Sequence, residues 1–190
     1  MSKKSRLLKK LRAIRRKGNH EVYFEDEVHF QRSTSIIRSW SLKGIVSEIK
    51  SPPVKEKISF FGAMGADNGQ LIIMEANPFC AVSFRSFLET VMKKATTKKK
   101  ILMVLDNARY HHAKMNKEFI KEMKSRMELI YLPPYSPELN PIEFLWKKTR
   151  RAVTHNRYFE SLEEQRISLK VFFNKFRKPN EELIRLSANI

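Results

Sequence analysis

The order of hydrophobic patterns along the chain is its strongest constraint on the fold. Three stretches typical of strands come first, and from residue 82 onward apolar residues recur at helical spacing in segments that alternate with short apolar runs. The run at 101–105 is continuous and apolar, as expected of a strand that is covered on both faces. The predicted element order is βββαβαβα, which indicates an α/β fold with a mixed five-stranded sheet and flanking helices.

Turn and capping signals set the boundaries of these elements. Asp67-Asn68-Gly69 separates the second and third strands and predicts a tight hairpin. Residues 33–41 are expected to add a short strand around Ile36, Ile37 and Trp40. Near the end of the chain, Ser161 and Glu164 form the capping-box pattern of one more amphipathic helix, which should end before Pro179. The other predicted strands lie near 22–30, 58–64, 71–74, 101–105 and 129–132, and the other predicted helices near 82–92, 119–123 and 140–153.

The charge of the chain is strongly positive. Its 38 Lys and Arg residues against 20 Asp and Glu residues give a net charge of +18, which favours a polyanionic partner. The apolar runs are far shorter than the roughly 18 residues of a membrane-spanning helix, so nucleic acid is the expected partner and a membrane is not. Cys80 is the only cysteine, so there is no internal disulfide, and a reducing, cytoplasmic compartment is expected.

The first 20 residues carry nine Lys or Arg residues and no acid. Leucines at helical spacing predict a short helix that ends at Gly18. A solvated basic arm or linker and a DNA-contacting segment are both consistent with this pattern.

Acidic residues are the candidates for chemistry. Of the three Asp residues, Asp67 belongs to the predicted turn, whereas Asp26 lies in the first strand and Asp106 directly follows the fourth. Strands that are distant in sequence can be neighbours in a sheet, and two carboxylates brought together repel unless a cation lies between them. Carboxylate ligands without a Cys or His set favour Mg²⁺ or Mn²⁺.

A third acid follows a proline-rich segment, residues 133–141. Asn140 is a good N-cap, Pro141 suits the first helical position, and Glu143 falls in the first turn. Glu143 therefore has two interpretations, a metal ligand or the acidic partner of a capping box.

Three phrases of the sequence resemble the catalytic domain of DDE transposases of the mariner superfamily, in its bacterial insertion sequence 630 branch. They are residues 24–27 (FEDE), 105–111 (LDNARYH) and 132–143 (LPPYSPELNPIE). The resemblance covers about residues 21–155 and implies a ribonuclease-H-like fold. The implied domains are a basic arm or linker remnant (1–20), the catalytic domain (21–156) and a C-terminal helical extension (157–190).

The resemblance also implies a site and a reaction. Asp26, Asp106 and Glu143 would be the catalytic and metal-binding triad, with 36 residues between the last two. Glu27 is the alternative to Asp26, but its side chain should point to the opposite face of the strand. Two Mg²⁺ or Mn²⁺ ions would support cleavage of DNA at transposon ends and strand transfer into target DNA.

Members of this superfamily usually carry N-terminal helix-turn-helix modules, for which residues 1–20 are too short. The expected partners are DNA, a second copy of the chain, and a helix-turn-helix half from an upstream reading frame, in the bacterial nucleoid. A truncated nucleic-acid-binding remnant and a nuclease without strand transfer are the alternatives.

Basic and aromatic residues near these phrases are candidates for contacting DNA. Basic residues are predicted to hold phosphates without reading sequence. His111 and His112 could position a phosphate or be polar loop residues, and Trp146 is predicted to be core rather than a base-stacking platform. The basic residues are Arg109, Lys147, Lys148, Arg150 and Arg151.

Overall fold

The computed structural model describes residues 2–44, 48–95 and 98–188. A mixed sheet of five strands forms its centre, and its fold class agrees with the predicted one. The strands are β1 (His20–Gln31), β2 (Lys57–Gly65), β3 (Leu71–Glu75), β4 (Lys100–Leu105) and β5 (Met127–Tyr131).

The strands lie in the order β3-β2-β1-β4-β5, so the first strand is at the centre. β1 is antiparallel to β2 and parallel to β4, and the hairpin between β2 and β3 turns through Gly69 with a φ of 64°. The last paired residues of β1 and β4 are Phe24 and Val104. Both strands therefore carry their next residues to the same edge of the sheet, where β1 continues alongside β2 only.

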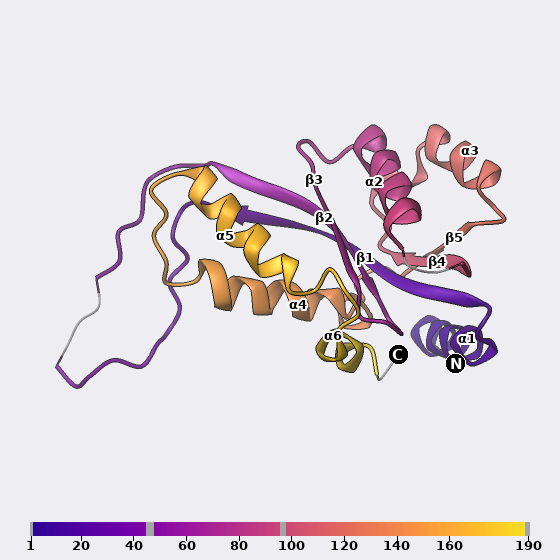
Figure 1. Cartoon of the computed structure of the whole chain (residues 1–190), viewed down its shortest axis with the longest axis horizontal. Helices are drawn as coiled ribbons and strands as arrows, with labels where there is room; N and C mark the ends of the chain where they lie inside the picture. Colours follow the sequence, from indigo (N-terminus) through magenta and orange to yellow (C-terminus); the bar gives the residue numbers. More distant parts are fainter. Residues whose placement is uncertain (1, 45–47, 96–97, 189–190) are drawn as a thin grey trace.

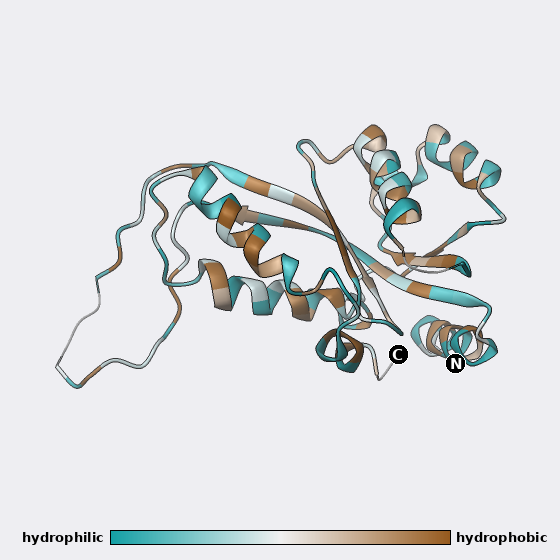
Figure 2. Ribbon diagram, viewed as in Figure 1, coloured by the Kyte–Doolittle hydropathy of each residue, from teal (hydrophilic) through white to brown (hydrophobic). Residues whose placement is uncertain are grey.

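Helices cover both faces of the sheet (Figure 1). One face packs against α2 and α3, and the other against α4, α5 and α6, with a short π-helical turn, η3, continuing α4. Hydrophobic and hydrophilic residues alternate along α5, as expected of a helix with one buried stripe (Figure 2). The helices are α1 (Lys3–Lys17), α2 (Ala81–Lys94), α3 (Lys114–Glu122), α4 (Ile142–Thr149), α5 (Leu162–Asn174) and α6 (Glu181–Leu186), with 3₁₀ turns η1 (Arg109–His112) and η2 (Pro137–Leu139) and the π turn η3 (Arg150–Thr154).

Helix α1 contributes to the core. Leu7 and Leu11 are buried against side chains of β1, β4 and β5, including Val22 and Val104. The helix ends as predicted at Gly18, whose φ is 69°. The basic side chains thus lie on a helix whose apolar stripe is packed on the sheet. The domain boundaries at residues 20 and 156 stay a prediction.

Two local predictions are wrong. Residues 36–44 form no strand in the described part of the chain, and Ile36 and Trp40 are exposed, because this segment extends away from the sheet between β1 and β2 (Figure 1). Just before this segment, an isolated β-bridge joins Ser35 to His155. Helix α4 begins at Ile142, with Pro141 rather than Asn140 at its N-cap. Within the described ranges no helix is long and apolar enough to cross a bilayer.

Candidate active site at the edge of the sheet

The register of the sheet brings two of the predicted acids together. Phe24 pairs with Val104, so Asp26 and Asp106 each lie two residues beyond this pair on neighbouring parallel strands. The side chain of Asp26 is on the face covered by α4, with those of Phe24 and Val28, because alternate residues of a strand share a face. The side chains of Glu25 and Glu27 are on the opposite face, as the strand pattern predicts.

Glu143 reaches the same place from the first turn of α4. Asp26, Asp106 and Glu143 line one open pocket of about 370 Å³, together with residues of the proline-rich loop. The side chain of Asn107 donates a hydrogen bond of 2.5 Å to the Leu132 carbonyl oxygen and so ties this loop to the end of β4. The three predicted site residues are therefore neighbours in space, while their role stays a prediction.

The capping alternative for Glu143 does not fit the structure. In a capping box its carboxylate would accept a hydrogen bond from the Asn140 amide N–H. That N–H instead donates to the Pro137 carbonyl oxygen, at 2.9 Å. The Asn140 side chain also has another role, because its Nδ2 donates to the Glu25 carbonyl oxygen at 2.8 Å and joins the start of α4 to β1. The side chain of Glu143 is thus available to the pocket.

The electrostatics of the pocket favour a bound cation. Burial, followed by the negative charges of Glu143 and Glu27, raises the pKa of Asp26 to about 8. In contrast, hydrogen bonding by His111 and by the Ala108 N–H lowers the pKa of Asp106. A positive charge in the pocket would favour the ionised form of Asp26 at neutral pH. Three carboxylates at one pocket are the oxygen donors that hard divalent cations prefer, so the residues present fit Mg²⁺ or Mn²⁺.

Trp146 fixes the position of Asp26, a role that its sequence position did not reveal. Its Nε1 donates a hydrogen bond of 2.9 Å to Asp26 Oδ2, and its ring is buried in the core, as predicted. The ring can approach the strand because Gly62 pairs with Asp26 on β2. A Cβ atom on Gly62 would lie 2.5 Å from Cη2 of Trp146. The signal available in the sequence was a glycine inside an apolar strand, which often marks such a close approach.

The two adjacent histidines occupy different environments. His111 is buried, and its Nε2 lies 3.5 Å from Glu27 Oε1 and 3.9 Å from Glu25 Oε2 on the face opposite the pocket. Burial alone would lower the pKa of His111, but the Asp106 and Glu27 carboxylates outweigh it and raise this pKa to about 10. His112 packs against the ring of Tyr131. Because His111 is enclosed, it does not face the space that a phosphate would occupy in the pocket.

Four of the five predicted phosphate-binding residues lie together, and Arg109 lies apart from them. Lys147, Lys148, Arg150 and Arg151 line a groove of about 780 Å³ on the outer side of α4 and η3. Lys148 is ion-paired with Glu182. Arg109 is exposed on η1, beside the acid pocket rather than in this groove.

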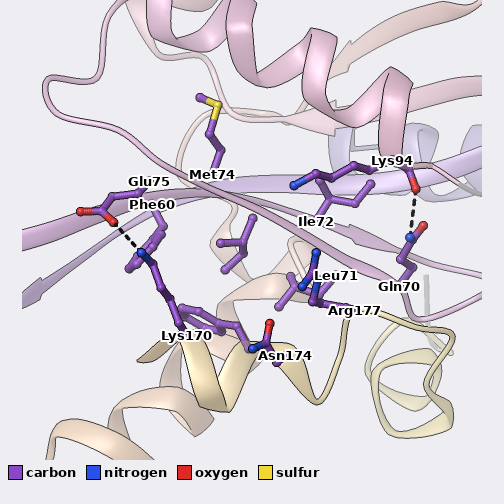
Figure 3. A pocket seen from close by; sticks show the side chains of 12 residues that line it. Phe60, Gln70, Leu71, Ile72, Met74, Glu75, Lys94, Lys170, Asn174 and Arg177 are labelled. Carbon is purple, nitrogen blue, oxygen red and sulfur yellow. Dashed lines mark hydrogen bonds and ion pairs between the residues drawn. The ribbon is translucent and has the colours of Figure 1, made fainter. Parts of the chain in front are cut away.

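A separate hollow of about 550 Å³ lies along β3, between that strand and α5 (Figure 3). The ion pair between Lys170 and Glu75, at 3.8 Å, and the hydrogen bond from Gln70 Nε2 to the Lys94 carbonyl oxygen, at 3.1 Å, lie along it. None of the three predicted acids lines it, so it does not compete with the acid pocket as the place of chemistry.

Comparisons with known proteins agree with this architecture. The chain is 28% identical over 145 residues to the insertion element IS630 uncharacterized 39 kDa protein of Shigella sonnei, covering 76% of this chain and 42% of that protein. Its fold is similar to that of Mos1 transposase in a paired-end complex with the left transposon end, with a TM-score of 0.71, 18% identity, and coverage of 96% of this chain and 55% of that one. A Mos1 mariner paired-end complex with Mn gives a TM-score of 0.70 at 18% identity, covering 96% of this chain and 55% of that one. The chain thus spans about half the length of these relatives or less.

The model of one family, described as DDE superfamily endonuclease, matches residues 21–166. This range contains the five strands, apart from His20 at the start of β1, and the three acids of the pocket. The chain belongs to the DDE superfamily of endonucleases.

Proposed function

We propose that the chain is the catalytic domain of a transposase, which cleaves DNA at transposon ends and transfers the strand into target DNA. The single observation that carries this proposal is the convergence of Asp26, Asp106 and Glu143 on one open pocket. These residues come from two neighbouring strands and a helix, so their meeting depends on the fold rather than on local sequence. Two of the similar proteins are an insertion element protein and a transposase in complex with a transposon end, and both support the same choice of substrate.

The three carboxylates would hold two divalent cations, Mg²⁺ or Mn²⁺. This is supported by the raised pKa of Asp26, whose repulsion with Glu143 a cation would relieve. The complex of the similar mariner transposase contains Mn. When bound, such ions lower the pKa of an attacking water and neutralise charge that develops on the leaving oxygen.

The protein's own groups orient the acids and the DNA. Trp146 donates to Oδ2 of Asp26, and the Ala108 N–H donates to Oδ1 of Asp106 at 2.8 Å, so both carboxylates are held before substrate arrives. The basic groove on α4 and η3 attracts phosphates on the flanking DNA. No protein nucleophile is needed for this reaction.

Two reactions would follow in sequence. In cleavage, a water oxygen attacks the scissile phosphorus, the bond from phosphorus to the 3′ oxygen breaks, and a 3′-hydroxyl is released. In strand transfer, that hydroxyl attacks a target phosphodiester, forms a new phosphorus–oxygen bond and displaces the target's 3′ oxygen. The number of phosphodiester bonds is conserved in the second step, so it requires no external energy source.

The finer assignments belong to the same proposal. The active form would be a homodimer that acts in the bacterial nucleoid. A helix-turn-helix half encoded in an upstream reading frame would recognise the transposon ends. Measuring the molar mass of the chain in complex with transposon-end DNA would test whether it is a dimer.

The test is a cleavage assay on a labelled duplex that carries the ends of the DNA element encoding the chain, with Mg²⁺ or Mn²⁺. We expect nicking at the end and joined products when target DNA is present. Absence of nicking would favour a non-catalytic nucleic-acid-binding remnant, and nicking without joining would favour a nuclease without strand transfer.

Glu143→Gln is the decisive variant, because it keeps the size and polarity of the side chain but removes the charge that a cation requires. Cleavage should fall about 100–1,000-fold, as for loss of a major electrostatic contribution in an active site, while circular dichroism stays unchanged. Glu138→Gln is the matched control, since Glu138 lies in the same loop but pairs with Lys4 and does not line the pocket. Full activity of Glu143→Gln would refute the assignment.

A further inference from the structure

A buried cluster lies directly behind the acid pocket, on the other face of β1. It consists of Glu25, Glu27 and His111, whose candidate ligand atoms lie within 4.8 Å of one another. The side chains of Glu25 and His111 are fully enclosed. Both carboxylate oxygens of Glu25, Oε1 of Glu27 and Nε2 of His111 have no hydrogen-bond partner in the part of the chain that the structure describes. Burying polar groups without hydrogen-bond partners is unfavourable, so the cluster needs a physical explanation.

The His111 ring connects this cluster to the pocket. Its Nδ1 lies 3.3 Å from Oδ1 of Asp106 and 3.3 Å from the Asp106 carbonyl oxygen, while its Nε2 faces Glu27 and Glu25. One ring nitrogen therefore faces an acid of the pocket and the other faces the buried acids. Because Nδ1 faces two oxygens of Asp106, the tautomer with its proton on Nδ1 donates toward Asp106.

The contacts of Asp106 orient its carboxylate. The Ala108 N–H donates to Oδ1 at 2.8 Å, and Nδ1 of His111 approaches the same oxygen. Both interactions are on Oδ1, and the side chain of Asp106 is 54% exposed. Oδ2 takes part in neither contact, and Asp106 lines the pocket.

The ring of His111 is itself held rigidly. Its centroid lies 4.2 Å from that of Phe84 and 4.5 Å from that of Tyr110. The backbone N–H of His111 donates to the Ala108 carbonyl oxygen at 3.0 Å, which closes the turn between the acid and the histidine. A ring fixed by packing and by backbone can hold a neighbouring carboxylate in one orientation.

We propose that His111, supported by Glu27 and Glu25, is a positioning residue that presents Oδ2 of Asp106 to the metal in the pocket. The inference rests on the proposed function, because it takes Asp106 as a metal ligand. Partners that hydrogen-bond to metal ligands orient them, and their loss typically lowers metal affinity about 10–100-fold. The acids behind the sheet thus act through His111 and do not touch the substrate.

The test compares two replacements of His111 by direct titration of the protein with Mn²⁺, which needs neither DNA nor cleavage. His111→Leu fills the space but removes both ring nitrogens, and its dissociation constant for Mn²⁺ should rise about 10–100-fold. His111→Asn places an amide Nδ2 near the position of Nδ1 and should stay within about fivefold of the wild type. His112→Asn is the matched control, since its ring packs on Tyr131, and it should bind Mn²⁺ like the wild type.

Cleavage gives the second measurement. In His111→Leu the Mn²⁺ concentration for half-maximal rate should rise, and the rate at saturating Mn²⁺ should recover most of the wild-type value. An unchanged Mn²⁺ affinity in folded His111→Leu would overturn the proposal, as would equal losses in the Asn and Leu variants. If the wild type binds Mn²⁺ but does not cleave, the proposed function fails and the titration still decides the role of His111.

A further variant separates positioning from direct metal binding at the cluster. The triple variant Asp26→Asn, Asp106→Asn, Glu143→Gln removes the acids of the pocket and leaves Glu25, Glu27 and His111 in place. We expect it to bind no Mn²⁺ in the concentration range that saturates the wild type. Binding that persists in the triple variant and is lost on adding His111→Leu would show that the cluster itself holds the ion, and would overturn the positioning role.

Discussion

Replacing Asp26 by Asn should make the metal-free protein more stable, although the position lies in the central strand. Asn has the shape of Asp, and its side-chain carbonyl can accept the hydrogen bond that Trp146 Nε1 donates at 2.9 Å. It lacks the charge that burial, Glu143 and Glu27 make unfavourable. The substitution therefore keeps the geometry and removes the electrostatic penalty.

The size of the effect follows from the pKa of Asp26. This pKa is about 8 in the folded protein against an ordinary value of 3.8, so the group takes up a proton on folding. A raised carboxyl pKa means that wild-type stability falls as pH rises from about 4 to about 8 and then levels off. Each pH unit in this interval costs up to about 1.4 kcal/mol, which gives roughly 4 kcal/mol at pH 7. Partial exposure of Asp26 to solvent reduces this to roughly 2–4 kcal/mol.

Urea unfolding at pH 5, 6, 7, 8 and 9 in the presence of EDTA measures the effect. The free energy of unfolding of Asp26→Asn should exceed that of the wild type, and the difference should grow from pH 5 to pH 8. Adding Mg²⁺ at pH 8 should stabilise the wild type more than the variant, because the ion supplies the missing positive charge.

Asp67→Asn is the matched control. Asp67 is ion-paired with Arg15 in the exposed hairpin turn, so its loss should change stability little and give no gain that rises with pH. The reasoning is refuted if Asp26→Asn is less stable than the wild type at pH 8, or if the difference is the same at pH 5 and pH 8.

Three further predictions concern the surroundings of the pocket. Gly62→Ala should lower the free energy of unfolding, measured with urea, by about 1–3 kcal/mol, since its Cβ would lie 2.5 Å from Cη2 of Trp146. Adding Trp146→Phe, which has a smaller ring, should recover part of this loss. An unchanged stability of Gly62→Ala would contradict the close approach. Asn140→Ala should cost about 1–3 kcal/mol in the same measurement, because the buried Glu25 carbonyl loses its donor; a loss near zero would argue against the bond. Lys147 and Arg151 line the groove, and replacing both by Gln should weaken the salt dependence of DNA binding, measured by fluorescence anisotropy. The slope of the logarithm of the binding constant against the logarithm of the salt concentration should become shallower by about 2, since each lost phosphate contact contributes about 0.9. Lys124→Gln, outside the groove, should leave the slope unchanged, and equal slopes for all three proteins would show that the groove does not contact the DNA.

Local sequence was sufficient to predict the five strands and helices α1 to α5, but not α6. The continuous apolar run at 101–105 predicted a strand covered on both faces, and β4 is buried at each of these residues. The helical periodicity of α2 predicted one buried stripe, which the structure shows. The N-cap at Ser161 also behaves locally, with its side chain accepting from the Glu164 N–H at 3.1 Å. The predicted strand around Trp40 was wrong, because the apolar residues of this segment, such as Ile36 and Trp40, pair with no strand in the described ranges and remain exposed.

Sequence also indicated Asp26 and Asp106 as candidates, because buried strands rarely carry carboxylates without a reason. The resemblance to DDE transposases implied Glu143 as the third acid. Sequence determined that Asp26 and Glu27 would point to opposite faces, since the alternation of a strand is a property of its backbone. It left two interpretations for Glu143, because Asn140 and Glu143 have capping-box spacing whether or not the box forms.

Only the tertiary structure decided how these parts meet. The pairing of Phe24 with Val104 brings Asp26 beside Asp106, and the bond from Asn140 to the Glu25 carbonyl draws α4 onto β1 and leaves Glu143 to the pocket. The approach of Trp146 over Gly62 and the burial of His111 behind the sheet likewise depend on contacts between distant segments. Periodicity reports the environment of a residue along its own element, whereas strand register and helix docking, set by packing of the whole core, determine which side chains share a site.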